Sequence, residues 1–143
     1  MSRRFKIEKQ FDYNGYECVV IGTQQGHRCG YVKIDNPTQE MKEHPYELGL
    51  NVHGGITYGS YGQDYPIKKR KRTFWLGFDC AHYRDGKDWD LIKELNDYEK
   101  YTKLKEIEDK YSLISPEEMV RYCDYIEKEL EFLVDQLIKI GIE

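Results

Sequence analysis

The sequence predicts an α+β fold in which a mostly antiparallel sheet from the N-terminal half is packed by C-terminal helices, the last of them long. Short β-rich runs separated by turn residues fill residues 1–85, whereas apolar residues recur every three or four positions from residue 88 onward. A chain of 143 residues suffices for one hydrophobic core. We therefore predict a single domain, 1–143, with the sheet and site loops in 1–85 and a helical part in 88–143.

The first three strands are predicted by composition and turn chemistry. Apolar and polar residues alternate at the start of 5–11, Asn14-Gly15 supplies a hairpin turn, and 16–21 is rich in residues that favour strands. The run 27–34 predicts a third strand, in which Gly30 marks a bulge or a close approach of the backbone to a ligand.

Two long loops are predicted on either side of a fourth strand. Residues 35–47 contain Asn36-Pro37 and His44-Pro45, and the residue before a proline disfavours helix. Residues 48–58 predict a strand interrupted by Gly54-Gly55, and 59–72 a second loop of a length typical of binding loops. The aromatic and β-branched run 73–78 predicts a central strand.

The helical part is predicted from period and capping. Residues 88–111 show the spacing of one amphipathic helix or two short ones, irregular near Asn96-Asp97. Ser115-Pro116-Glu117-Glu118 forms a capping box, and Gly141 ends a helix of about 25 residues. Its apolar stripe is predicted to pack on its own sheet. The alternative is a dimer interface with the same helix of a second copy.

The charges divide the chain into two unlike halves. Residues 1–78 carry 12 basic and 8 acidic residues, a net +4, whereas 79–143 carry 10 and 18, a net −8. An acidic half disfavours binding to long nucleic acid. The basic run 68–72 either holds phosphates or is a solvated charge run, the latter being favoured. No apolar stretch is long enough to span a membrane, and the four cysteines form no C-x-x-C pair. Both observations predict a cytoplasmic protein with four free thiols.

The most informative stretch is 50–85, where two strand-like runs each deliver a histidine among glycines or acids. One interpretation is a metal hydrolase built from His53, Asp79, His82 and Asp85, because imidazole and carboxylate are ligands for zinc or manganese. Another pairs Cys80 with a histidine as a nucleophile. Simple structural roles, such as a turn stabilised by aspartate and a buried thiol, are favoured over both.

We favour the interpretation of a pocket that binds a ligand without catalysing a reaction. Gly54-Gly55 can aim backbone amides at an anion, and aromatic rings can stack on a base. Arg84 can hold phosphate, while histidine and aspartate side chains can contact a ribose or the edge of a base. The predicted ligand-binding residues are His53, Gly54, Gly55, Thr57, Tyr58, Trp75, Asp79, His82, Arg84 and Asp85. No metal and no cofactor are predicted.

Three motifs carry a resemblance to a known family. They are GHRCGYV at 26–32, VHGGITY at 52–58 and WLGFDCAH at 75–82 followed by Asp85. In this combination the chain resembles a widespread family of small, mostly uncharacterised phage and prophage proteins. The residue pair before the final aspartate is usually small in that family, whereas here it is Tyr83-Arg84.

The resemblance implies a phage accessory protein acting in the cytoplasm of an infected bacterial host, and small phage proteins of this kind often counter host immunity. We therefore expect a homodimer or higher oligomer that sequesters a small anionic nucleotide signal, such as a cyclic ADP-ribose or a cyclic oligonucleotide. The alternatives are a hydrolase of such a nucleotide, either metal-dependent or using histidine and aspartate as acid and base, and an inhibitor that binds a host defence protein.

Overall fold

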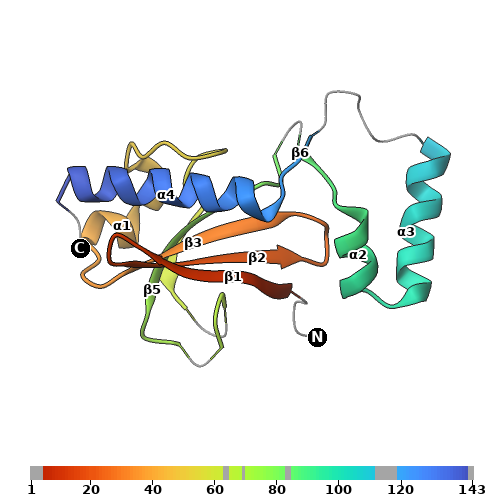
Figure 1. Cartoon of the computed structure of the whole chain (residues 1–143), viewed down its shortest axis with the longest axis horizontal. Coiled ribbons are helices and arrows are strands. Elements are labelled where there is room, and N and C mark those ends of the chain that lie inside the picture. Colours follow the sequence, from red (N-terminus) through yellow and green to blue (C-terminus); the bar gives the residue numbers. More distant parts are fainter. Residues whose placement is uncertain (1–4, 63–64, 69, 83–84, 112–118, 142–143) are drawn as a thin grey trace.

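The computed structural model describes residues 5–62, 65–68, 70–82, 85–111 and 119–141. A five-stranded antiparallel sheet has the strand order β1-β2-β3-β5-β4. Its strands are β1 (Phe5–Tyr13), β2 (Tyr16–Thr23), β3 (Arg28–Ile34), β4 (Tyr58–Tyr61) and β5 (Phe74–Asp79). Helix α4 (Cys123–Lys139) lies across one face of this sheet (Figure 1). The predicted α+β class is confirmed.

The sheet has two different faces. Strand side chains alternate between a large core beneath α4 and a second, smaller cluster on the opposite face, which contains Tyr31 and Trp75. Tyr65 and Ile67, from the loop between β4 and β5, pack on the second cluster. That loop lies on the side of the sheet away from α4 (Figure 1). The basic run that it carries is therefore separated from the α4 face by the sheet.

The first hairpin, β3 and β5 form where they were predicted. The turn between β1 and β2 places Asn14 at φ 49° and Gly15 at φ 88°, the left-handed conformations that a two-residue hairpin turn requires. Strand β5 pairs with β3 on one side and with β4 on the other, so it is not an edge strand.

The segment between β3 and β5 differs from the prediction. The expected loop at 35–47 contains a short helix, α1 (Gln39–Glu43), capped by the Thr38 side chain, and a 3₁₀ turn (Pro45–Glu47). The predicted strand at 48–58 is wrong, because the fourth strand covers only Tyr58–Tyr61. The backbone of Asn51 and His53, within the predicted strand, bonds to side chains of α4 instead. Asn51 exchanges two hydrogen bonds of 2.8 and 2.7 Å with the Gln136 side chain of α4, so this segment follows the helix and not a strand.

The helical part begins as two short helices, as one alternative predicted. Helices α2 (Trp89–Leu95) and α3 (Tyr98–Tyr111) are separated at Asn96–Asp97. Together they form an arm at one end of the sheet (Figure 1).

Helix α4 is shorter than predicted. It has 17 residues and begins at Cys123, because Met119–Val120 (β7) pairs in parallel with Asp85–Gly86 (β6). The predicted capping box at 115–118 lies outside the described residues. The inward packing of α4 is confirmed by its fully buried side chains, which are Ile126, Leu130, Leu133, Val134 and Leu137.

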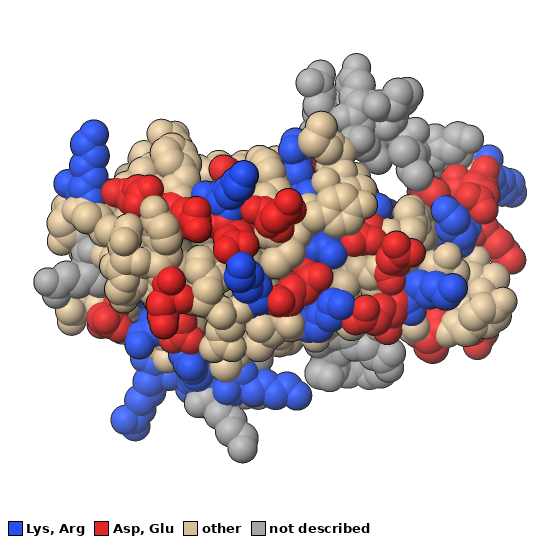
Figure 2. Space-filling model, viewed as in Figure 1, with Lys and Arg blue, Asp and Glu red and all other residues tan. Residues whose placement is uncertain are grey.

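The surface carries charged side chains of both signs (Figure 2), and the cysteines are buried or partly buried. The face in view mixes acidic and basic side chains, while Lys and Arg side chains project at its lower edge (Figure 2). Cys18, Cys29 and Cys80 are buried thiols outside any disulfide, and Cys123 is a partly buried one. Among the described residues, no helix combines the length and the apolar character needed to cross a membrane.

Candidate functional site

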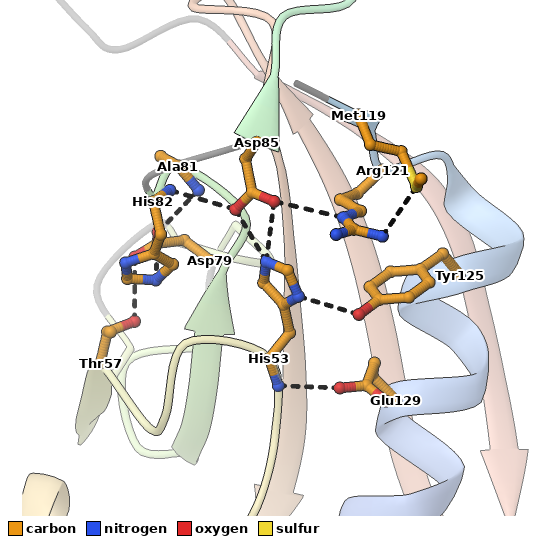
Figure 3. A network of polar contacts seen from close by, with 10 residues as sticks. All are labelled: His53, Thr57, Asp79, Ala81, His82, Asp85, Met119, Arg121, Tyr125 and Glu129. Carbon is orange, nitrogen blue, oxygen red and sulfur yellow. Dashed lines mark hydrogen bonds and ion pairs between the residues drawn. The ribbon is translucent and has the colours of Figure 1, made fainter. Parts of the chain in front are cut away.

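The two histidine-bearing segments meet at the end of β5. The ring centroids of His53 and His82 lie 6.2 Å apart. His53 comes from the irregular segment that precedes β4, and His82 from the turn that follows β5, while α4 closes the other side (Figure 3). The two histidines were predicted to face a common space, and the structure brings them together.

His53 and Asp85 form a closed inner pair. The Nε2 atom of His53 lies 2.7 and 2.9 Å from the two carboxylate oxygens of Asp85. The same carboxylate accepts the His82 backbone N–H at 3.1 Å and the Arg121 Nε–H at 3.2 Å. The Asp85 side chain is 1% exposed and that of His53 is 14% exposed. The charge of Asp85 is thus buried but fully bonded, as a stable buried carboxylate requires.

The other ring nitrogen of His53 is bonded to α4. Its Nδ1 atom lies 2.8 Å from the Tyr125 hydroxyl, and its backbone N–H donates to Glu129 at 2.8 Å. An ionised aspartate only accepts, so Nε2 carries a proton. In the neutral imidazole, Nδ1 accepts from Tyr125, and in the imidazolium it donates. Both ring nitrogens are occupied in either case.

Hydrogen bonds favour the ionised form of Asp85, and burial makes the neighbouring Cys80 thiol unreactive. Burial alone would raise the pKa of Asp85, but hydrogen bonds from His53, His82 and Arg121 outweigh it and lower the pKa. Burial raises the pKa of the neighbouring Cys80 thiol well above its usual range. A catalytic cysteine needs a lowered pKa, so the described environment does not activate Cys80 as a nucleophile.

Asp79, His82 and Thr57 form a more open outer group. Asp79 accepts the Thr57 hydroxyl and the Ala81 backbone N–H, both at 3.0 Å. His82 Nε2 lies 3.2 Å from Asp79 Oδ1, but the geometry does not make a hydrogen bond. The Asp79 and His82 side chains remain 32% and 36% exposed. Asp79 therefore stabilises the turn, as the structural interpretation predicted, and still reaches solvent.

Gly54 allows His82 to lie where it does. A Cβ atom at Gly54 would stand 2.3 Å from two atoms of the His82 ring, a distance that real side chains do not adopt. At Gly55 the corresponding position is open, although both glycines have positive φ angles of 70° and 80°. The imidazole of His82 thus packs directly on the backbone of the segment that carries His53.

A hollow of about 390 Å³ adjoins the same segment. Three of the predicted site residues, Gly54, Gly55 and Thr57, line it together with Tyr46, whose ring is 71% exposed. Its volume is in the range of small-molecule sites. The Gly55 N–H bonds to the Val52 carbonyl at 2.9 Å and is not available to an anion, whereas the Gly54 N–H has no acceptor among the described residues.

Two predicted site residues lie elsewhere. Trp75 is fully buried in the cluster on the face of the sheet away from α4, and Tyr58 packs against that cluster. The Tyr58 ring is 5.4 Å from Tyr31 in an edge-to-face contact. Neither ring lies beside His53. Arg84 falls outside the described residues.

The donor set for a metal differs from the predicted one. His53, Cys80 and Asp85 each offer a ligand atom, and these atoms lie within 4.8 Å of one another. Imidazole, thiolate and carboxylate are a donor set suited to zinc. The Arg121 Nε atom is only 3.2 Å from Asp85, however, and the imidazole and carboxylate are bonded to each other. A metal would have to displace these contacts.

Several residues of the site were missed by sequence reasoning. Tyr125 and Glu129 lie four residues apart on one face of α4, and Arg121, which precedes the helix, packs over the Tyr125 ring at 4.7 Å. In the sequence the three residues recur at intervals of four. That spacing was visible, but a polar stripe of this kind is equally typical of a solvated helix face. Tyr46 gave no signal beyond its position in a predicted loop.

The comparisons with known proteins do not identify the chain. No protein-family model matches it, and neither the curated proteins nor the solved structures yield a match.

Proposed function

We propose that this chain binds a small nucleotide-like ligand at the outer group and the adjoining hollow, and holds it without turnover. The proposal rests on one contrast: the inner pair has its hydrogen bonds satisfied within the protein, and the outer group remains partly exposed. The groups best suited to acid-base chemistry, His53 and Asp85, are closed by internal bonds. The partly exposed groups, Asp79 and His82, can instead donate to and accept from a ligand.

Each part of the ligand has a proposed partner. The exposed ring of Tyr46 would stack on the base, which is the role first assigned to Trp75 or Tyr58. Asp79 and His82 would contact ribose hydroxyls or the edge of the base, and Thr57 would keep the Asp79 carboxylate in place. The Gly54 N–H and Arg84 would contact phosphate.

The biological setting of the proposal rests on the family resemblance. It is that of a phage accessory protein that counters host immunity by sequestering a cyclic ADP-ribose or a cyclic oligonucleotide in the cytoplasm of the infected bacterium. We also propose a homodimer or higher oligomer, which light scattering of the purified protein would test.

A binding and release experiment tests the proposed function. The purified protein is incubated with a panel of nucleotide second messengers, then separated from free ligand and heat-denatured, and the released material is analysed by chromatography. We expect one intact ligand to be depleted and then recovered. If no nucleotide is depleted, the proposal is wrong, and inhibition by binding a host defence protein becomes the better interpretation.

Two variants and a control link this experiment to the site. His82→Asn and Tyr46→Ser are expected to abolish depletion, because each removes a ligand contact at the protein surface. Tyr98→Ser serves as the control, since Tyr98 is 78% exposed on α3 and does not line the hollow. Depletion that survives both site variants would place the ligand elsewhere.

Hydrolysis of the same ligand class is the second candidate, favoured by the His53, Cys80 and Asp85 donor set. In this case the released material would be a cleaved product, and added zinc would raise the thermal midpoint of the wild type but not of Cys80→Ser. Recovery of intact ligand after long incubation with zinc, manganese or magnesium would exclude this candidate for that ligand.

A further inference from the structure

A second hollow, of about 440 Å³, lies between the β2–β3 turn and the arm formed by α2 and α3. It adjoins the turn that holds Asp79 and His82, because Ala81 of that turn is one of its lining residues. Ile92 and Ile107 contribute apolar walls. The size and mainly apolar lining are those of a small-molecule site, and neither the outer group nor the inner pair accounts for it.

One wall of this hollow carries an acidic side chain, Glu108, that has no partner among the described residues. Glu108 of α3 is only 6% exposed, and within the described part of the chain it makes no hydrogen bond and no ion pair. The carboxylate oxygens of Glu108 are not among the buried unpartnered atoms, so they keep access to the hollow. They can therefore accept hydrogen bonds from a molecule bound there.

The same hollow is lined by a donor without an acceptor. The indole Nε1 of Trp89 is buried, and no hydrogen-bond acceptor lies within reach of it among the described residues. Buried indole N–H groups usually have an acceptor. Trp89 and Glu108 both line the hollow, and the first has a donor and the second an acceptor without a partner among the described residues.

The rim of the hollow is cationic. Lys87 and Lys100 are exposed lining residues, and neither forms an ion pair with any described residue. The pKa of the nearby His27 is lowered, first by burial and then by the positive charge of Lys87. Two lining ammonium groups without an ion-pair partner among the described residues suit a ligand that carries a negative charge at one end.

We propose that this hollow is a separate binding site for a guanine nucleotide. The guanine edge presents an acceptor, O6, beside two donors, N1–H and N2–H. The acceptor suits the Trp89 N–H, and the two donors suit the Glu108 carboxylate. The flat ring lies against Ile92 and Ile107, and the phosphate lies near Lys87 and Lys100. This site is separate from the outer group, so a result that contradicts one of the two proposed sites leaves the other proposal standing.

The two tryptophans allow a direct test by NMR. Guanosine monophosphate is titrated into the ¹⁵N-labelled protein, and the two indole N–H signals are followed. We expect the Trp89 signal to move and that of Trp75, which is fully buried in the cluster beneath the sheet, to stay. Inosine monophosphate lacks the 2-amino donor and is expected to bind about 10-fold more weakly, since a hydrogen bond to a charged group contributes about 1.5–3 kcal/mol.

A matched pair of variants completes the test. Glu108→Gln is expected to weaken guanosine monophosphate at least 10-fold by the same reasoning, whereas Glu106→Gln, an exposed position on the same helix, leaves it unchanged. Glu108→Gln should not lower the thermal midpoint of the free protein, because the native carboxylate has no partner to lose. A Trp89 signal that does not move at millimolar nucleotide, or equal affinity in the two variants, would overturn the proposal.

Discussion

His53 and His82 are neighbours with opposite surroundings. Their ring centroids are 6.2 Å apart, yet His53 has both ring nitrogens bonded and a side chain that is 14% exposed. The His82 side chain is 36% exposed, although its Nε2 atom is buried 3.2 Å from Asp79 without a hydrogen bond. Residue type and proximity alone therefore do not show which role a histidine has. A buried histidine with both ring nitrogens bonded stabilises the architecture, whereas the exposed part of the neighbouring His82 ring can contact a ligand.

The largest difference between the two groups is expected from their aspartates. Asp85→Asn removes a buried charge and leaves Arg121 beside a neutral group. Breaking a buried pair in this way typically costs about 3–5 kcal/mol. Asp79→Asn changes a side chain that is 32% exposed and should cost less than about 1 kcal/mol. Urea unfolding of both variants, monitored by circular dichroism, measures the two free energies.

The same experiment can contradict the distinction between the groups. If Asp79→Asn destabilises the protein as much as Asp85→Asn, the outer group is a second structural network and not a site open to ligands. Because the m-value reports the surface exposed on unfolding, an unchanged m-value for each variant ensures that only stability has changed.

The next largest effect is expected at the contact between the two groups. Gly54→Ala and Gly55→Ala both place a side chain at positive φ, which costs about 1–2 kcal/mol in each variant. Only Gly54→Ala also meets the His82 ring, at 2.3 Å, and overpacking of this kind adds about 1–3 kcal/mol. The difference in unfolding free energy between the two variants isolates the contact with His82.

An NMR measurement locates that difference. The imidazole signals of His82 should shift in Gly54→Ala and stay in Gly55→Ala, because the added methyl group at Gly55 meets open space. Equal stability of the two variants, with His82 unmoved in both, would show that the added methyl group at Gly54 does not meet the ring.

The sheet was predictable because its signals are local. The Asn14-Gly15 turn demands left-handed backbone, and the alternation of core residues in β2 and β5 fixes which face each strand buries. The proximity of His53 and His82 was predicted from two polar clusters in apolar surroundings. Such clusters are costly unless their members bond one another, so proximity followed from energetics.

The rest depended on contacts between distant parts of the chain. The segment at 48–57 has strand-like residues, but Gln136 and Glu129 of α4 bond its backbone, and sequence patterns do not reveal a partner about 80 residues away. Trp75 was predicted to belong to the site because an aromatic ring can stack on a base. Adjacent strand residues point to opposite faces, however, and the face of Trp75 is the one away from α4.

A smaller effect is expected from pH. The pKa of Asp85 is lower in the folded protein than its unfolded value of about 3.9, so the unfolded chain binds more protons in that range. The stability that ionised Asp85 contributes is present above pH 4 and lost as the pH falls toward the folded pKa. The gap in stability between wild type and Asp85→Asn should therefore narrow on acidification, as measured by urea unfolding from pH 7 to pH 3. A gap that stays constant would mean that the carboxylate is not held ionised.

The smallest effect is expected at the edge of the inner pair. Tyr125→Phe removes only the hydroxyl that bonds His53 Nδ1 at 2.8 Å, and a single hydrogen bond contributes about 0.5–1.5 kcal/mol. Tyr122→Phe is the matched control, because its ring is 55% exposed and its hydroxyl has no bond among the described residues, so its stability should stay within about 0.5 kcal/mol of wild type. If ligand depletion is intact in Tyr125→Phe while stability falls, the inner pair supports the site without touching the ligand. Loss of depletion with unchanged stability would instead make Tyr125 and His53 part of the binding surface, and the division between the two histidines would disappear.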